Sequence, residues 1–145
     1  MTSSPSRPLD HAGLEVLSNR ECTRLLHDHQ VGRVAFLEAG EPWILPVVYR
    51  LDGNRIVFRS AVGAKLDIAE RAGPIAFEID GWDEEDRVGW SVLVRGLPHD
   101  ITDADEIARL DALGVEQWVA GPYPMRWIVI TTDEITGRRI SPHQA

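Results

Sequence analysis

The segment Pro46–Leu66 constrains the fold more than any other part of this 145-residue chain. Asp52–Asn54 predicts a tight hairpin turn, because Gly and Asn tolerate the positive φ angles that such turns require. Apolar and polar side chains alternate along Arg55–Ser60, which is the period of a strand. Lys65 follows the strand's last residues, Arg59 and Ser60, at the expected start of a helix. Two cations, a hydroxyl and free helix amides would form an anion site, for which phosphate is the commonest candidate.

Further segments of the chain alternate as β-strands do, and short helices separate some of them. A capping box at Ser18 and Glu21 predicts the first helix, Lys65–Ala72 predicts a second, and Thr102 or Asp103 would cap a third. The strands are expected at Val31–Leu37, Pro42–Tyr49, Arg55–Ser60, Pro74–Trp82, Val88–Leu97 and Met125–Thr132, with Ile135–Ile140 as an optional continuation. We therefore expect a mainly β fold with short α-helices, a small barrel of about six antiparallel strands.

One strand of this barrel carries a proline. Pro46 cannot donate a hydrogen bond to a neighbouring strand, so the strand is expected to be bulged or at an edge there. A bulge beside a ligand is a common arrangement.

Length and local composition indicate one domain. Residues 14–145 are expected to form it, and the polar, Ser- and Pro-containing residues 1–13 are predicted to be a disordered tail. No apolar run approaches the roughly 18 residues of a membrane span, and no signal peptide precedes the first element. A cytoplasmic protein is the expectation.

Charge and cysteine content exclude several classes of function. Fifteen Lys and Arg against 23 Asp and Glu give a net charge of −8, which argues against DNA or RNA as a partner. The single cysteine, Cys22, excludes an internal disulfide and a multi-cysteine zinc site. The acidic run Asp83–Asp86 lacks the ligand spacing of a calcium loop, so no metal is predicted. No Ser-His-Asp, Cys-His or H-E-x-x-H constellation is present, and we name no catalytic residue.

The order of several short motifs makes the chain recognisable as a whole. It resembles the pyridoxamine 5′-phosphate oxidase-like FMN-binding split-barrel family, and within it the small actinobacterial type. The resemblance covers about residues 16–140. It is carried by LSNRECTRLL, VGRVAF, LPVVY, DGNRIVFRS, GAKL, IAFEID, GWSVLVRG and ITGRRI, in that order.

The resemblance implies a homodimer of split barrels with a flavin in the groove between the two chains. It implies that the backbone of Pro46, Val47 and Val48 lies against the flavin ring. It implies that Arg59, Ser60 and Lys65 hold the flavin phosphate. Trp90 and Ser91 match the region where the partner strand approaches the ring, and Arg138, or its neighbour Arg139, resembles a late arginine that reaches cofactor or substrate.

FMN is the cofactor that the resemblance implies, with a deazaflavin coenzyme as the alternative and haem as a rarer one. The expected function is hydride transfer between this flavin and a small molecule whose identity the sequence does not give. The alternative is a non-catalytic flavin- or haem-binding protein. The basic residues that hold a second phosphate in true pyridoxamine phosphate oxidases have no dense counterpart here, so vitamin B6 oxidation is not expected.

Overall fold

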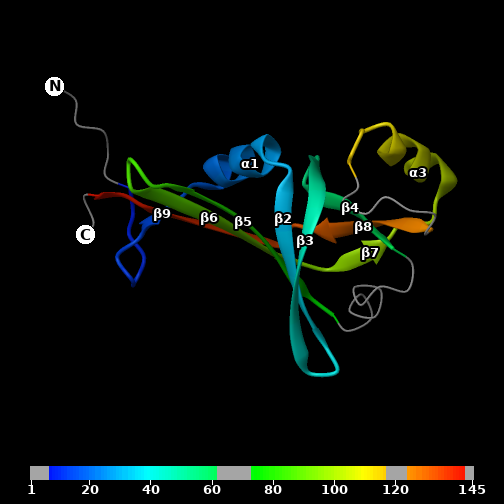
Figure 1. Ribbon diagram of the computed structural model, residues 1–145, viewed down its shortest axis with the longest axis horizontal. Helices are drawn as coiled ribbons and strands as arrows, with labels where there is room; N and C mark the ends of the chain where they lie inside the picture. The colour runs from blue at the N-terminus through cyan, green and yellow to red at the C-terminus, as the bar shows by residue number, and fades with distance from the viewer. Residues whose placement is uncertain (1–6, 62–72, 117–123, 143–145) are drawn as a thin grey trace.

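The computed structural model describes residues 7–61, 73–116 and 124–142. In these residues nine strands form one curled antiparallel sheet, and two helices pack on it, one near each end (Figure 1). The elements are β1 (Glu15–Val16), α1 (Asn19–Asp28), β2 (Val31–Glu38), β3 (Glu41–Asp52), β4 (Arg55–Ala61), β5 (Ile75–Asp83), β6 (Val88–Gly96), β7 (Pro98–Asp100), α3 (Ala104–Asp111), β8 (Met125–Thr131) and β9 (Glu134–Ile140). The strand order is β1-β9-β6-β5-β2-β3-β4-β8-β7. The predicted split-barrel fold is confirmed.

The sheet curls because β3 changes partner along its length. Its first part pairs with β2, from Glu41 opposite Glu38 to Val48 opposite Val31, and its last four residues pair with β4. Pro46 lies in the first part, where β2 is the only strand paired with it, so the missing N–H falls on an edge. The ladder runs without a bulge, and the edge alternative is the correct one.

The segment β8–β9 closes the curl on the other side of the sheet. β8 pairs with β4 and β9 pairs with β6, although only two residues separate β8 from β9. The end of β6 therefore lies against the end of β8, where the backbone N–H of Thr131 donates to the carbonyl of Leu97 at 3.1 Å. Gly96 permits this approach, since a Cβ there would overlap the backbone of Thr131.

Two apolar clusters hold the helices on the sheet. The larger fills the barrel and includes Leu26 of α1 and Tyr49 of β3, whose hydroxyl donates to the Leu26 carbonyl at 2.6 Å. The smaller packs α3 onto β4 and β8 through Leu110 and Val57, both fully buried. The predicted capping box of Ser18 and Glu21 is present at α1, and Asp103 is the cap of α3.

Residues 7–13, at the end of the predicted N-terminal tail, contact one another and the sheet. Val16 donates its backbone N–H to Pro8, and Asp10 accepts from the backbone N–H groups of Ala12 and Leu14. Asp10 also binds Arg138 of β9. Asp10 thus closes a turn and pairs across to the sheet, while the disordered tail over residues 1–13 stays a prediction.

The helix predicted at Lys65–Ala72 falls outside the described residues. Within the described residues, neither helix is long and apolar enough to cross a membrane.

Candidate functional site

The candidate site lies where β3 and β4 separate. The last paired residues of the two strands are Tyr49 and Phe58, so Val48 and Arg59 are the first residues beyond the pairing. Val48 packs against the cluster of α3, β4 and β8 that contains Trp127. The structure thus brings the predicted phosphate ligand Arg59 and the predicted ring contact Val48 to the same side of the sheet.

Arg59 is held in place from two directions. Its guanidinium carbon lies 4.5 Å from the centre of the Trp127 ring, a cation–π contact. Its Nη2 donates to Oδ1 of Asp111 at 3.0 Å, and Nε1 of Trp127 donates to the same oxygen at 2.8 Å. The Arg59 side chain keeps 22% of its surface exposed. A fixed cation with an open side can bind an anion with little loss of conformational entropy.

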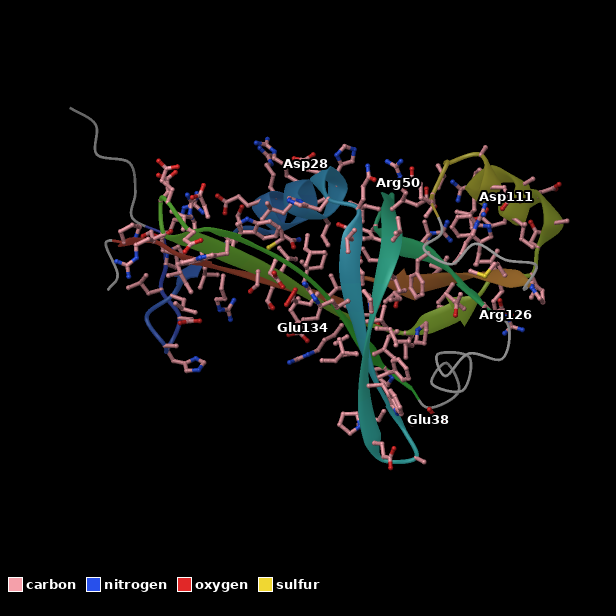
Figure 2. The ribbon with its side chains drawn as sticks, viewed as in Figure 1. Asp28, Glu38, Arg50, Asp111, Arg126 and Glu134 are labelled. Carbon is pink, nitrogen blue, oxygen red and sulfur yellow. The ribbon has the colours of Figure 1, made fainter. Side chains whose placement is uncertain are left out.

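Ser60 points the other way. Consecutive strand residues face opposite sides of a sheet, so Ser60 shares the barrel side with Arg126, its register partner on β8. Nη1 of Arg126 lies 3.2 Å from Oδ2 of Asp100. Figure 2 shows Asp111 and Arg126 at the same end of the molecule. Because their side chains face opposite sides of β4, Arg59 and Ser60 can contact the same phosphate only at the end of that strand. Lys65, the third predicted phosphate ligand, lies outside the described residues.

A four-residue ionic network fixes the helix that carries Asp111. Arg109 binds Asp52 through two hydrogen bonds of 3.0 and 2.8 Å and binds Glu106 at 2.7 Å. Arg55 binds the same two carboxylates at 2.7 and 2.8 Å. Hydrogen bonds from Arg109, followed by those from Arg55, lower the pKa of Asp52 to about 2 and the pKa of Glu106 to about 2. This network ties α3 to the β3–β4 hairpin.

The ring platform predicted at Pro46, Val47 and Val48 lies on the edge of β3. Val47 packs toward the barrel core and Val48 toward α3, while Pro46 is exposed. Edge strands present N–H and C=O groups that pair with no strand. The stretch therefore offers backbone hydrogen-bonding groups beside Arg59, as the resemblance implies.

Trp90, Ser91 and Arg138 lie elsewhere in the chain. β5 and β2 separate β6 from β3 in the sheet. The three residues also lie on two faces of the sheet. Trp90 shares one face with its register partner Arg139, and Ser91 shares the other face with its register partner Arg138. Nε of Arg138 donates to Asp10 at 2.6 Å. Within one chain these residues cannot share a site with Arg59.

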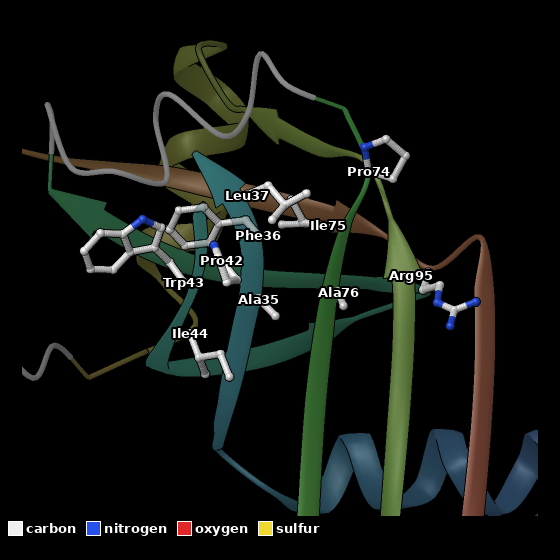
Figure 3. Close-up of a pocket in the computed structure, with 10 residues that line it drawn as sticks. All are labelled: Ala35, Phe36, Leu37, Pro42, Trp43, Ile44, Pro74, Ile75, Ala76 and Arg95. Carbon is white, nitrogen blue, oxygen red and sulfur yellow. The ribbon is translucent and has the colours of Figure 1, made fainter. Parts of the chain in front are cut away.

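An apolar cavity of about 440 Å³ opens at the β2–β3 hairpin and the start of β5 (Figure 3). Arg95 is the only charged residue among the described residues that line it, and Trp43 and Ile44 form its apolar wall. Its volume falls within the range of roughly 300–1,000 Å³ that is usual for small-molecule sites. The sequence analysis did not predict this cavity. The available signal was the pair of apolar residues Leu37 and Ile44 on neighbouring strands, both of which are exposed in the structure.

One carboxyl on the face opposite α1 has an unusual environment. The pKa of Glu78 is raised to about 7, chiefly by burial and also by the neighbouring Asp80. Arg33, whose Nη1 lies 3.6 Å from Oε1 of Glu78, opposes this rise by a smaller amount. Oε1 of Glu78 is buried with no hydrogen-bond partner among the described residues. The same described residues contain no group of three or more His, Cys, Asp or Glu that could hold a metal ion.

The sequence reasoning also missed Asp111, Trp127 and Arg126. The strand Met125–Thr132 was predicted, but its pairing with β4 was not, and that pairing sets Trp127 beside Arg59. The alternation of side chains would have been a usable signal once the two strands were known to be neighbours.

Comparison with known proteins gives one family and several similar structures. A family model described as pyridoxamine 5′-phosphate oxidase matches residues 18–139. The chain is 35% identical over 130 residues to the Mycobacterium tuberculosis protein Rv0080, which covers 86% of this chain and 84% of the relative. The FAD binding protein from Mycobacterium smegmatis has a TM-score of 0.73 at 30% identity, covering 86% of this chain and 98% of that one.

A more distant structure binds two cofactors. The FAD and haem binding protein from Mycobacterium smegmatis has a TM-score of 0.67 at 16% identity and covers 86% of this chain and 72% of that one. At that identity the likeness establishes the fold alone.

Proposed function

The chain belongs to the pyridoxamine 5′-phosphate oxidase family, and from that premise we propose that it binds a flavin and transfers a hydride between the flavin and a small molecule. FMN is the cofactor implied by the sequence, and the similar Mycobacterium smegmatis protein binds FAD. The two share the isoalloxazine ring and the phosphate next to the ribityl chain. The proposal concerns that shared part, with a deazaflavin coenzyme as the alternative.

The observation that carries the proposal is the position of Arg59. It lies at the separation of β3 and β4, fixed by Trp127 and Asp111 and open on one side. A flavin phosphate bound there would leave the ring free to extend along the edge of β3. The backbone of Val48 can then donate to and accept from the polar edge of the ring, whereas Pro46 can only accept and the backbone groups of Val47 point toward β2.

A second copy of the chain completes the site. Ser91 and Arg138 share the face opposite α1, and neither reaches Arg59 within one chain. Two copies packed through this face would bring one chain's Ser91 and Arg138 near the other chain's cofactor. Trp90 and Arg139 face α1 instead, so we assign the partner contact to Ser91 and Arg138.

Bound flavin would supply two-electron redox chemistry, and the chain's own residues would bind and orient it. Arg59 holds the phosphate, the β3 edge fixes the plane of the ring, and Asp111 keeps the guanidinium over Trp127. No described side chain is assigned as a proton donor. The apolar cavity beside Trp43 and Ile44 is separate from Arg59 in its lining, and it offers room for an uncharged substrate.

Absorbance and titration test the proposal. The purified protein should be yellow and should release FMN or FAD on denaturation, or should bind added FMN when the cofactor has been lost. Arg59→Ala/Lys65→Ala should weaken FMN binding at least about 100-fold, because two charge-assisted contacts are lost. The control is Arg20→Ala/Arg24→Ala, which removes two exposed cations from α1. Equal affinities of the two double variants would refute the phosphate site.

Reduction separates the enzyme from a non-catalytic binder. If the protein is an enzyme, a nicotinamide donor or another small reductant should bleach the flavin band. If it is a carrier, it should bind the flavin without turnover. Haem finds no support in the hairpin cavity, whose described lining contains no His, Cys, Met or Tyr to ligate iron. A Soret band on haem addition, without flavin binding, would overturn the flavin proposal.

Chain association tests the second-copy contribution. Leu93 lies on β6 between Ser91 and Arg95, on the face opposite α1. Leu93→Asp should convert a dimer to a monomer in sedimentation and should lower flavin affinity with it. A monomeric wild-type protein that binds flavin at full affinity would contradict the shared site.

A further inference from the structure

A second pocket lies beneath α1, at the β6–β9 end of the sheet. Its volume is about 240 Å³, and it is lined by three aliphatic side chains, Trp90, three arginines and one glutamate. The arginines come from three separate parts of the chain: Arg7 from the N-terminal turn, Arg24 from α1 and Arg139 from β9. It shares no lining residue with the Arg59 site or with the hairpin cavity.

The balance of charge in this pocket is positive. Glu21, the only acid among the described residues that line it, accepts from the backbone N–H of Ser18 at 2.7 Å and pairs with Arg7 at 2.7 Å, and a carboxylate oxygen of Glu15 lies 3.9 Å from Nε of Arg7. Within the described part of the chain, the exposed guanidinium of Arg24 has no ion pair, and Nη1 of Arg7 is buried without a hydrogen-bond partner. In a protein of net charge −8, such a group of arginines is a local attractor for an anion.

Trp90 gives the pocket a fixed aromatic wall. Its indole lies across Gly81 of β5, where any side chain would overlap it. The His29 ring packs on it with a centroid distance of 4.7 Å. Trp90 also packs against the buried core. An aromatic surface that is already ordered can stack a planar ligand without a further cost in side-chain entropy.

From these features we propose that the pocket binds a small aromatic carboxylate of one ring, stacked on Trp90, with its carboxylate held by Arg24 and Arg139. The volume lies below the roughly 300 Å³ at which sites for drug-sized ligands begin, which limits the ligand to about one ring. A planar carboxylate matches the planar fork of a guanidinium. This site goes beyond the proposed flavin site and does not depend on it, because β5, β2 and β3 lie between β6 and Arg59 of the same chain, and Ser91 and Arg138, assigned to the partner contact, lie on the opposite face of the sheet from Trp90 and Arg139.

Calorimetry with benzoate tests the pocket on the protein as purified. Benzoate should bind at one site per chain with a dissociation constant of about 0.1–1 mM, as expected of a ligand of this size. Benzamide, which has the same ring without the charge, should bind at least about tenfold more weakly. No benzoate binding, or equal binding of the two compounds, overturns the proposal.

A pair of variants on one helix locates the site. Arg24→Gln should weaken benzoate binding about fivefold, since it removes one charge-assisted contact at an exposed position. Arg20→Gln makes the same change in charge one turn earlier on α1 and does not line the pocket. It should leave the affinity unchanged. Equal effects of the two substitutions would mean general charge attraction and would refute the site.

The Arg59→Ala/Lys65→Ala protein separates this inference from the proposed function. It should bind benzoate as the wild type does, whether or not the wild type binds flavin. If benzoate binding were lost there, the two sites would be one, and the inference of an independent pocket would be wrong. If the wild type bound benzoate but no flavin, the proposed function would fail and this pocket would stand.

Discussion

The two helices of the described residues cover opposite ends of one sheet, and ion pairs contribute differently to holding them there. α1 is anchored by the buried residues Cys22 and Leu26 in the barrel core, and its cation Arg24 makes no ion pair in the described part of the chain. α3 has one fully buried residue, Leu110, and is tied down by ion pairs to Asp52, Arg55 and Arg59. On α3, ion pairs to the sheet add to the apolar packing, whereas on α1 the cation Arg24 makes no ion pair in the described part of the chain and remains available to a ligand.

The comparison explains why Arg59 is both well placed and partly neutralised. Asp111 fixes the guanidinium that the proposed site needs, yet its negative charge opposes a phosphate. Arg24 has the reverse properties, since it is unopposed but must lose side-chain freedom on binding. The variants below separate these contributions.

The largest effect is expected from truncating the apolar anchors. Leu26→Ala and Leu110→Ala should each lower the free energy of unfolding by about 2–5 kcal/mol, because both side chains are fully buried. Only Leu110→Ala should also weaken FMN binding, since it loosens the helix that carries Asp111. Urea unfolding and FMN titration measure the two quantities. A comparable loss of FMN affinity in Leu26→Ala would remove the distinction between the helices.

The next effect concerns the network of α3 and its dependence on pH. Asp52→Asn should lower the unfolding free energy by about 1–2 kcal/mol at pH 7, because Asp52 binds two arginines. The pKa of Asp52 is lowered from 3.8 to about 2, so its stabilising contribution is complete above pH 4 and is lost as the pH falls toward 2.

Thermal unfolding at several pH values checks this assignment. The difference between the wild type and Asp52→Asn should be constant from pH 5 to 7 and should shrink steadily below pH 4. A difference that persisted unchanged at pH 2 would show that the carboxylate charge contributes nothing to holding α3.

A smaller effect distinguishes the geometry of Asp111 from its charge. Asp111→Asn retains an oxygen that can accept from Arg59 and Trp127, so it should tighten FMN binding about threefold by removing a screened repulsion. Asp111→Ala removes the acceptor as well and should weaken binding. FMN titration of the two variants gives the answer. A change of FMN affinity in the same direction in both variants would contradict the assignment of separate roles to the charge and the position of Asp111.

The smallest effect is expected on α1. Arg24→Gln should change the free energy of unfolding by less than about 0.5 kcal/mol, as is usual for an exposed residue without partners. A loss comparable to that of Asp52→Asn would show that Arg24 contributes to the fold. Urea unfolding of both proteins in one buffer makes the comparison direct.

The sequence predicted the individual elements better than their arrangement. The capping box at Ser18 and the hairpin at Asp52–Asn54 are local signals, and local hydrogen bonding determines both. The pairing of β4 with β8 joins Arg59 to Trp127 across 67 intervening positions of the sequence, and alternation within each strand says nothing about which strands are neighbours. For the same reason Trp127 and Asp111 were not foreseen as the residues that hold Arg59.

The division of Trp90 from Ser91 is a second lesson of the same kind. Both residues were expected near one ring, since the resemblance matches them to the region where the partner strand approaches the flavin. Strand geometry sends their side chains to opposite faces, and the register with β9 then pairs Trp90 with Arg139 and Ser91 with Arg138. A motif of adjacent residues in a strand therefore predicts two surfaces.

The two-residue link between β8 and β9 has a consequence for how the chain folds. The hairpins β2–β3 and β5–β6 join neighbours in sequence and can form early, whereas β8 and β9 must return to β4 and β6. Such distant pairings are slow to form. During synthesis the strands before β8 leave the ribosome first, with the edges of β4 and β6 unpaired until β8 and β9 emerge. These two strands then cover both edges, so their docking is the step that ends the exposure of β4 and β6 to intermolecular association.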